Sequence, residues 1–271
     1  ESGSMPFAQF HYPFENKEKF EQNYPGDFIT EYVAQTRAWF YYMHVMGVGL
    51  FGEKSFKNVI SHGTLAGNDG RKMSKSFGNY TEPTVLYDEI SADAWRVFLL
   101  TSPFMNGEDV DLLDKDVALM ERKLNMLYNT YDFFTMYASV DNYEAEYGKV
   151  PSSENPMDRW ILSKLQGVIK SAADGMDAFV LNDATRPMIE FLDDLSNWFV
   201  RRSRKRFWKS ENDGDKLAAY DTLYFVLVEY SKLLAPFAPF MAEDLFHKLT
   251  GKESVHLEDY PQQNPELVYA T

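Results

Sequence analysis

Two lysines in a glycine-flanked segment offer the clearest chemistry in this sequence. They belong to the run Lys72-Met73-Ser74-Lys75-Ser76, which Gly70 precedes and Gly78 follows. A lysine ammonium group is a compact positive charge that can stabilise negative charge as it develops on phosphate oxygens. A flexible loop lets such groups close only after the phosphates have bound. Residue types alone leave a solvated basic turn as the alternative, and no Gly-x-x-x-x-Gly-Lys-Ser/Thr motif is present to indicate a P-loop.

A second set of polar side chains has helical spacing. Glu31, Gln35 and Trp39 are four residues apart, so a helix would place them on one face. A carboxylate and an amide can hold an ammonium group and a ribose, and an indole can wall an apolar pocket. Ordinary core and surface positions are the alternative for these three residues.

A basic segment stands out because the chain carries a formal net charge of −14. Its members are Arg201, Arg202, Arg204, Lys205 and Arg206, with Trp198 just before them. Cations beside an indole suit phosphate contacts combined with base stacking. The acidic remainder disfavours unspecific nucleic-acid binding, so any such contact is local. A solvated helix end is the alternative.

A histidine at the end of a predicted strand is a further candidate. Residues 56–61 favour a strand, and His62-Gly63 follows it directly, where α/β folds place ligands. The other histidines show no spacing typical of a metal site, and the chain has no cysteine, so we expect no metal site in this chain.

The pattern of elements changes once along the sequence. Apolar spacing predicts a helix over residues 28–48 that ends near Gly47 and Gly49, and the strand and further helices follow it. Beyond Pro103 every periodic stretch is helical, with stripes such as Met188, Leu192, Leu195 and Phe199 and a third bundle helix capped by Asn182 or Asp183. We expect an α/β segment over residues 1–105, a connecting helix and linker over 106–155, and an all-α bundle over 156–271.

Four segments together resemble the isoleucyl-tRNA synthetases, a family of class I aminoacyl-tRNA synthetases. The five-residue lysine run is identical to the Lys-Met-Ser-Lys-Ser loop of class I enzymes. The other resembling segments are Glu1-Ser2-Gly3-Ser4-Met5-Pro6, the stretch from Glu31 to Phe40, and Asn197-Trp198-Phe199-Val200-Arg201-Arg202-Ser203-Arg204. The stretch from Glu31 departs from the common pattern at Tyr32, Ala34 and Ala38.

The resemblance implies a fold, an activity and a role for each candidate residue. The fold would be the second half of a Rossmann-type class I catalytic domain followed by a helical anticodon-binding domain. The activity would be ATP-dependent activation of isoleucine to an adenylate and its transfer to tRNA(Ile), with Mg²⁺ accompanying ATP. Lys72 and Lys75 would be catalytic. The implied contacts are ATP at His62, Gly63, Met73, Ser74, Lys75 and Ser76; the adenylate at Glu31, Gln35 and Trp39; and tRNA at Trp198, Arg201, Arg202, Arg204, Lys205 and Arg206.

Two alternatives stay open at this point, a valyl-tRNA synthetase and a non-catalytic tRNA-binding module. The His-x-Gly-His motif that class I enzymes use to bind ATP is absent, so we expect this stretch to be inactive by itself. No run of 18 apolar residues and no basic–apolar leader occurs in it. We therefore expect a cytoplasmic monomer that does not bind a membrane.

Overall fold

The computed structural model describes residues 1–71, 73–208 and 213–269. Contacts divide the chain into two compact units. The first unit comprises Glu1–Tyr80 and Ser102–Leu112, and the helical unit comprises Thr81–Thr101 and Leu113–Thr271. The domain boundaries that the sequence predicts at residues 105 and 155 stay predictions.

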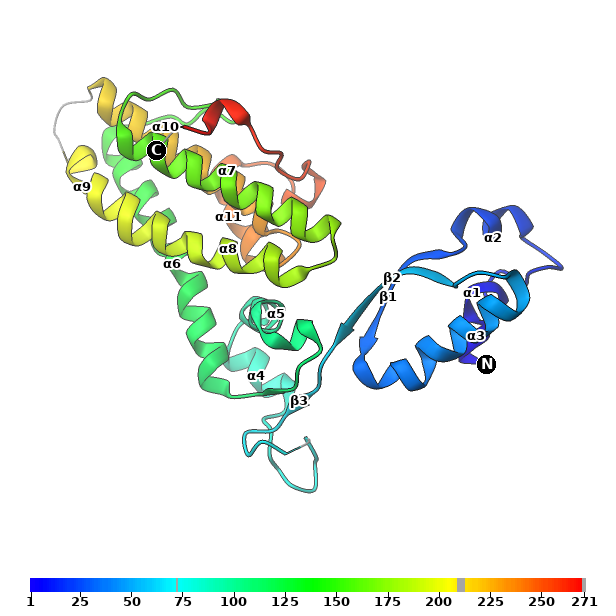
Figure 1. The fold of residues 1–271 in the computed structure, drawn as a ribbon. Coiled ribbons are helices and arrows are strands. Elements are labelled where there is room, and N and C mark those ends of the chain that lie inside the picture. The colour runs from blue at the N-terminus through cyan, green and yellow to red at the C-terminus, as the bar shows by residue number, and fades with distance from the viewer. Residues whose placement is uncertain (72, 209–212, 270–271) are drawn as a thin grey trace. The chain divides into compact units, whose positions relative to one another are not determined.

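The first unit is built around two short pairs of parallel strands. Strand β1 (Gly26–Tyr32) pairs with β2 (Phe56–His62), and β3 (Leu65–Ala66) pairs with β4 (Val110–Asp111). Helix α3 (Trp39–Phe51) connects β1 to β2 through the 3₁₀ turn η2 (Val33–Arg37), which makes a β-α-β crossover (Figure 1). The remaining elements of this unit are η1 (Ser2–Ser4), α1 (Met5–Ala8), α2 (Lys17–Asn23) and η3 (Pro103–Asn106).

The helix predicted over residues 28–48 is wrong in its first half. Residues up to Tyr32 form β1, and helix α3 begins only at Trp39. A short run rich in aromatic and β-branched residues fits either period, and pairing with β2 decides for the strand. The predicted helix end is wrong as well, because α3 continues through Gly47 and Gly49 to a left-handed Gly52 with φ of 74°.

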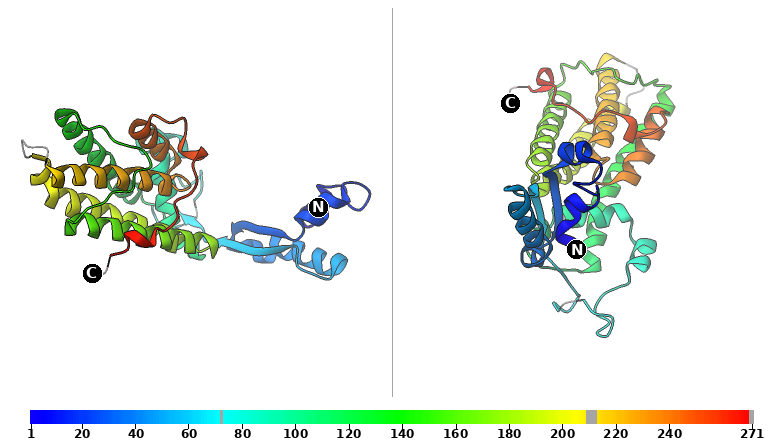
Figure 2. Two further views of the ribbon diagram at one scale, coloured as in Figure 1. Left: turned by 90° about the horizontal axis from the view of Figure 1, so that it is seen from above. Right: turned by 90° about the vertical axis from the view of Figure 1, so that its right-hand side faces the viewer.

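The helical unit packs its long helices side by side. Helices α7 and α8 are neighbours, and α10 packs on both α7 and α11, an arrangement that can be followed from two further directions in Figure 2. Its elements are α4 (Pro83–Glu89), α5 (Ala92–Thr101), α6 (Asp114–Asp141), α7 (Pro156–Asp177), α8 (Leu181–Asp193), the π-helical η4 (Asp194–Val200), α9 (Arg201–Trp208), α10 (Gly214–Leu234), α11 (Pro239–Thr250), η5 (Val255–Leu257) and η6 (Pro265–Leu267).

The predicted apolar stripes form the core of this bundle. Met188, Leu192, Leu195 and Phe199 are all at most 1% exposed, as a one-sided helical stripe requires. The predicted cap of the third bundle helix is wrong, because α8 begins at Leu181, so Asn182 and Asp183 lie inside its first turn. Among the described residues, every helix is too short or too polar to cross a lipid bilayer.

Candidate functional site

The parallel pair β1–β2 places two sets of predicted site residues at one edge. Tyr32 is in register with His62, and Glu31 is in register with Ser61. Both strands therefore end at the same place, and their carboxyl ends form the edge where α/β sheets bind ligands. Sequence spacing had connected Glu31 with Gln35 and Trp39 through a helix face. The structure instead places Glu31 and His62 on neighbouring strands, where Glu31 lies one residue before Tyr32, the partner of His62.

The side chains that follow β1 are held by backbone groups. Glu31 lies on the strand, Gln35 in η2, and Trp39 at the start of α3, so the shared helix face is wrong. The Trp39 backbone N–H donates to Gln35 Oε1 at 3.0 Å, which satisfies an N–H in the first turn of α3. The Trp39 indole donates to the carbonyl of Ser2 at 3.1 Å. These bonds fix the indole and the amide beside the end of β1.

His62 is the last residue of β2, and Gly63 follows it directly. The His62 ring stacks on Phe104 with centroids 4.6 Å apart, and His62 Nδ1 lies 2.9 Å from the Gly63 carbonyl. Because a carbonyl only accepts, Nδ1 is the donor in this contact. A side chain at position 63 would place its Cβ 1.8 Å from the Glu108 carbonyl oxygen, so only glycine fits there.

The lysine loop is held from one side while its second lysine is exposed. Lys72 lies outside the described residues. The Ser74 backbone N–H donates to Asn79 Oδ1 at 3.0 Å, and the Ser74 and Ser76 hydroxyls are 2.7 Å apart. Met73 is half-buried, and Lys75 is exposed without an ion pair to any residue that the structure describes. An exposed, unpaired ammonium group on an anchored loop suits a phosphate ligand.

Asp69 and Asn79 anchor this loop, and neither was singled out from the sequence. Asn79 is 3% exposed and donates to Asp69 Oδ1 at 2.8 Å, while Arg71 Nε donates to Asp69 Oδ2 at 2.8 Å. The bond from Asn79, with those from Arg71, lowers the pKa of Asp69 to about 2. The available signal was an Asp and an Asn on either side of the lysine run, residue types that favour turn hydrogen bonds.

Four of the predicted tRNA-binding cations face solvent on α9. Arg201, Arg202, Arg204 and Lys205 are exposed, and none forms an ion pair with a residue in the described ranges. The Arg202 guanidinium lies 4.9 Å from the Trp198 ring centroid, and Trp198 is 52% exposed. This pairing resembles the aromatic surfaces on which proteins stack the bases of single-stranded nucleic acids.

Arg206 is a correction to the predicted tRNA-binding set. Its side chain is buried, with two bonds to the fully buried Asp158 at 2.6 and 2.8 Å and one to Asp215 at 3.0 Å. A guanidinium held by two carboxylates is not available to phosphate. The missed signal was spacing, because Arg206 lies seven residues beyond Phe199 and so continues the buried stripe.

A hollow of about 370 Å³ lies beside the exposed cations. Its cationic wall is Arg201 and Arg204, and the other lining residues are Asn129, Thr130, Phe133, Ser196, Asn197 and Val200. Two guanidinium groups with amide and hydroxyl neighbours fit an anionic group. The hollow thus lies between the exposed cations of α9 and polar and aromatic residues of α6.

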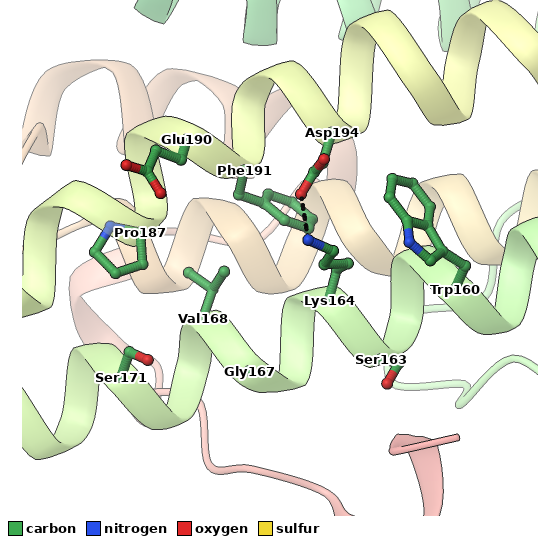
Figure 3. Close-up of a pocket in the computed structure, with 10 residues that line it drawn as sticks. All are labelled: Trp160, Ser163, Lys164, Gly167, Val168, Ser171, Pro187, Glu190, Phe191 and Asp194. Atoms are coloured by element: carbon green, nitrogen blue, oxygen red, sulfur yellow. Dashed lines mark ion pairs between the residues drawn. The ribbon is translucent and has the colours of Figure 1, made fainter. Parts of the chain in front are cut away.

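A separate groove between α7 and α8 holds none of the predicted site residues. Figure 3 shows Trp160 at one end, Pro187 towards the other, and the Lys164 ammonium directed at Asp194. Lys164 Nζ lies 3.1 Å from Asp194 Oδ2. Lys164 therefore already has an ionic partner within the groove. Among the described residues, no three His, Asp or Glu side chains gather as metal ligands anywhere in either unit.

The chain matches two families along its length. Residues 1–111 match the family of tRNA synthetases class I (I, L, M and V), and residues 158–271 match the anticodon-binding domain of tRNA ligases. Both ranges are therefore similar to parts of tRNA ligases, and the first is similar to those of class I. The first range contains the strand edge and the lysine loop, and the second contains the basic surface of α9.

Within this class the chain is similar to isoleucine--tRNA ligases. It is 43% identical to that of Treponema denticola over 98% of its own length and 43% identical to that of Chlamydia trachomatis serovar D over 96%. The chain spans 26% of the length of each of these relatives.

Solved structures agree with the predicted fold. The LeuRS of Agrobacterium radiobacter K84, in a ternary complex with tRNA and LeuAMS, superposes with a TM-score of 0.77 at 21% identity over 99% of this chain and 33% of that one. A methionyl-tRNA synthetase from Mycobacterium tuberculosis in complex with methionyl-adenylate gives 0.70 at 24% identity over 88% of this chain and 47% of that one. The predicted α/β segment followed by a helical bundle is confirmed.

Proposed function

We propose that this chain is part of an ATP-dependent isoleucine–tRNA ligase. The complete protein would activate isoleucine with ATP to isoleucyl-adenylate and then acylate tRNA(Ile). The observation that carries the proposal is the register of β1 with β2, because Glu31 and His62, predicted from two separate motifs, both lie at the carboxyl end of this strand pair, the edge where α/β sheets commonly bind ligands. Identity of 43% to isoleucine--tRNA ligases across both units supports the choice of isoleucine over valine.

The predicted catalytic, ATP-binding and adenylate-binding residues that the structure describes have surroundings compatible with their proposed roles. Lys72 and Lys75 stabilise the charge that develops on pyrophosphate as AMP leaves, and the exposed Lys75 ammonium has no competing partner among the described residues. His62 and Gly63, with Met73 to Ser76, hold ATP. Glu31 and Gln35 hold polar groups of the adenylate, and the fixed Trp39 indole walls the isoleucine side chain.

ATP supplies the adenylyl group, and Mg²⁺ accompanies it as part of this proposal. We assign no residue to the metal, since no acidic cluster is found in the described part of the chain. No step is therefore derived through it.

The helical unit would bind the tRNA. Arg201, Arg202, Arg204 and Lys205 contact phosphates, and Trp198 offers its exposed face to a base. Their lack of ion-pair partners in the described residues supports this role, because nearby cations such as Lys123 and Lys164 pair with Asp193 and Asp194. A monomeric state and a cytoplasmic location belong to the proposal on the strength of the resemblance alone.

Pyrophosphate exchange by the complete protein tests the proposal. We expect exchange that depends on isoleucine and a far higher specificity constant for isoleucine than for valine. Preference for valine would reverse the assignment within the class. Absence of exchange with every amino acid, together with retained tRNA binding, would favour the non-catalytic tRNA-binding module.

A further inference from the structure

Gly3 lies where the 3₁₀ turn η1 meets helix α3. It is buried, and a Cβ at this position would lie 2.9 Å from Tyr42 Cβ, 3.0 Å from the Tyr42 carbonyl carbon and 3.1 Å from its oxygen. These atoms are backbone or directly attached to it, so no side chain can rotate away to make room. Any larger residue at position 3 must push η1 away from α3.

The same turn holds the Trp39 indole. The carbonyl that accepts the indole N–H at 3.1 Å belongs to Ser2, the residue directly before Gly3. Both Ser4 N and Ser4 Oγ donate to the Glu1 carbonyl, at 3.0 and 2.7 Å. Because these bonds close the turn on itself, η1 moves as one piece, and a displacement at Gly3 carries the Ser2 carbonyl with it.

We propose that Gly3 is a positioning residue for Trp39. By allowing η1 to touch α3, it sets the Ser2 carbonyl at hydrogen-bonding distance from the indole and so fixes the orientation of the ring. This inference rests on the proposed function, in which the Trp39 ring walls the amino-acid side chain. Gly3 then contributes to the choice of amino acid without touching it.

Gly3→Ala in the complete protein tests the kinetic consequence. We expect the KM for isoleucine in pyrophosphate exchange to rise roughly five- to tenfold, as loss of one hydrogen bond predicts, with the KM for ATP unchanged. Gly49→Ala is the matched control, since it lies on the same helix and its added Cβ meets nothing within 4 Å. An unchanged KM for isoleucine, or an equal rise for ATP, would overturn the proposal.

A second variant separates positioning from general damage. Trp39→Phe keeps an aromatic ring but has no indole N–H, so it removes the bond to Ser2 directly. If Gly3 acts through that bond, the double variant shows the same KM for isoleucine as Trp39→Phe alone. Additive effects would mean that Gly3 acts by another route. Should Gly3→Ala fail to fold, Trp39→Phe must still raise the KM for isoleucine, and an unchanged value refutes the role of the bond.

A spectroscopic measurement distinguishes failure of this inference from failure of the proposed function. In protein labelled with 5-fluorotryptophan, the ¹⁹F resonance missing from Trp39→Phe identifies Trp39. We expect Gly3→Ala, and not Gly49→Ala, to shift it. A shift in a protein without isoleucine-dependent exchange would refute the proposed function and keep the positioning role, and an unmoved resonance would refute the positioning role whatever the substrate.

Discussion

The two units treat their apolar side chains in opposite ways. In the helical unit the stripes of α7, α8 and α10 are closed into a core, and Leu165, Leu195 and Leu227 are fully buried. In the first unit, α3 is apolar on every side, and Tyr41 and Leu50 are 55% and 59% exposed. A helix of this composition is stable only when other surfaces cover it. The helical unit therefore encloses these stripes, whereas α3 of the first unit leaves several apolar side chains exposed.

Charged side chains differ by their burial, and this difference occurs within the helical unit as well. The helical unit buries Arg206 with Asp158 and Lys216 with Asp141, and such pairs hold helices in a defined arrangement. The first unit leaves Lys75 exposed on its loop. Buried, ion-paired charges thus stabilise the packing of the helices. The exposed charges without an ion-pair partner among the described residues lie on the surfaces that we expect to bind a ligand.

The largest expected effect follows from breaking the buried pair. Asp158→Ala leaves the Arg206 guanidinium buried beside one remaining carboxylate, which should cost about 3–5 kcal/mol of unfolding free energy. Asp174→Ala removes an exposed partner of Lys170 and should cost no more than about 0.5 kcal/mol. Urea unfolding of both variants measures the difference, and equal losses would show that burial does not distinguish the scaffold charges.

A kinetic effect of similar size is expected in the first unit. In the complete protein, Lys75→Ala should slow adenylate formation on the order of 10²-fold or more, because a donor that stabilises developing charge is lost. Lys17→Ala removes an exposed cation of α2 that pairs with Glu21 and should leave the rate within about twofold. Rapid-quench measurement of adenylate formation decides. An unaltered rate for Lys75→Ala would contradict the catalytic role that we assign to the lysine loop.

A smaller effect is expected on the basic surface of α9. Replacing Arg201 and Arg204 by Gln should weaken tRNA binding and flatten its log–log salt dependence by up to about two, since each phosphate contact contributes roughly 0.7 to 0.9. Lys170 and Lys248, which pair with acids on their own helices, make a control of equal charge change. Filter binding across a salt series measures both. Equal slopes for the two double variants would mean that the α9 cations form a solvated helix end and make no phosphate contacts.

How far the sequence predicted the structure differs between the units for the same reason. Helices with a long one-sided stripe were predicted correctly because the apolar period is repeated over several turns, as in Met188, Leu192 and Leu195. The run from Phe28 is too short for a period to be decisive, and its partner β2 lies far along the chain. Pairing between distant segments, which a single sequence does not reveal, determined that region.

Site residues divide along a similar line. Lys75, His62 and Trp39 were predicted as site residues because their types and neighbours form motifs, and these assignments stay predictions. Gly3 was not assigned a role, because its close approach to Tyr42 joins segments that sequence spacing does not bring near. Asn79 was not assigned one either, although its partner Ser74 is only five residues away. Arg206 was misassigned with its exposed neighbours, although its place on the stripe of Phe199 pointed inward. Residue type predicted chemistry, and burial decided which residues are available for it.

The smallest expected effect concerns a buried carboxylate of the helical unit. Asp93 of α5 is 3% exposed and accepts from the Met241 backbone N–H, at the start of α11, at 2.7 Å. Burial raises its pKa above the usual value of 3.8, while the backbone bonds from Met241 and Phe240 oppose the rise. The folded protein therefore binds this proton more tightly than the unfolded chain does.

The sign of the pH dependence follows from that difference in proton affinity. As pH falls from neutral through the raised pKa towards 3.8, the native state takes up the proton first, so Asp93 contributes more stability at each step. Asp93→Asn does not titrate and keeps an oxygen for the Met241 bond. We expect the wild-type protein to gain stability relative to Asp93→Asn on acidification, with a slope that cannot exceed about 1.4 kcal/mol per pH unit. Urea unfolding of both proteins between pH 7 and about pH 4 measures this difference. If the difference in unfolding free energy stays constant, or if the wild type loses stability relative to Asp93→Asn, then the backbone bonds offset the effect of burial on the pKa of Asp93.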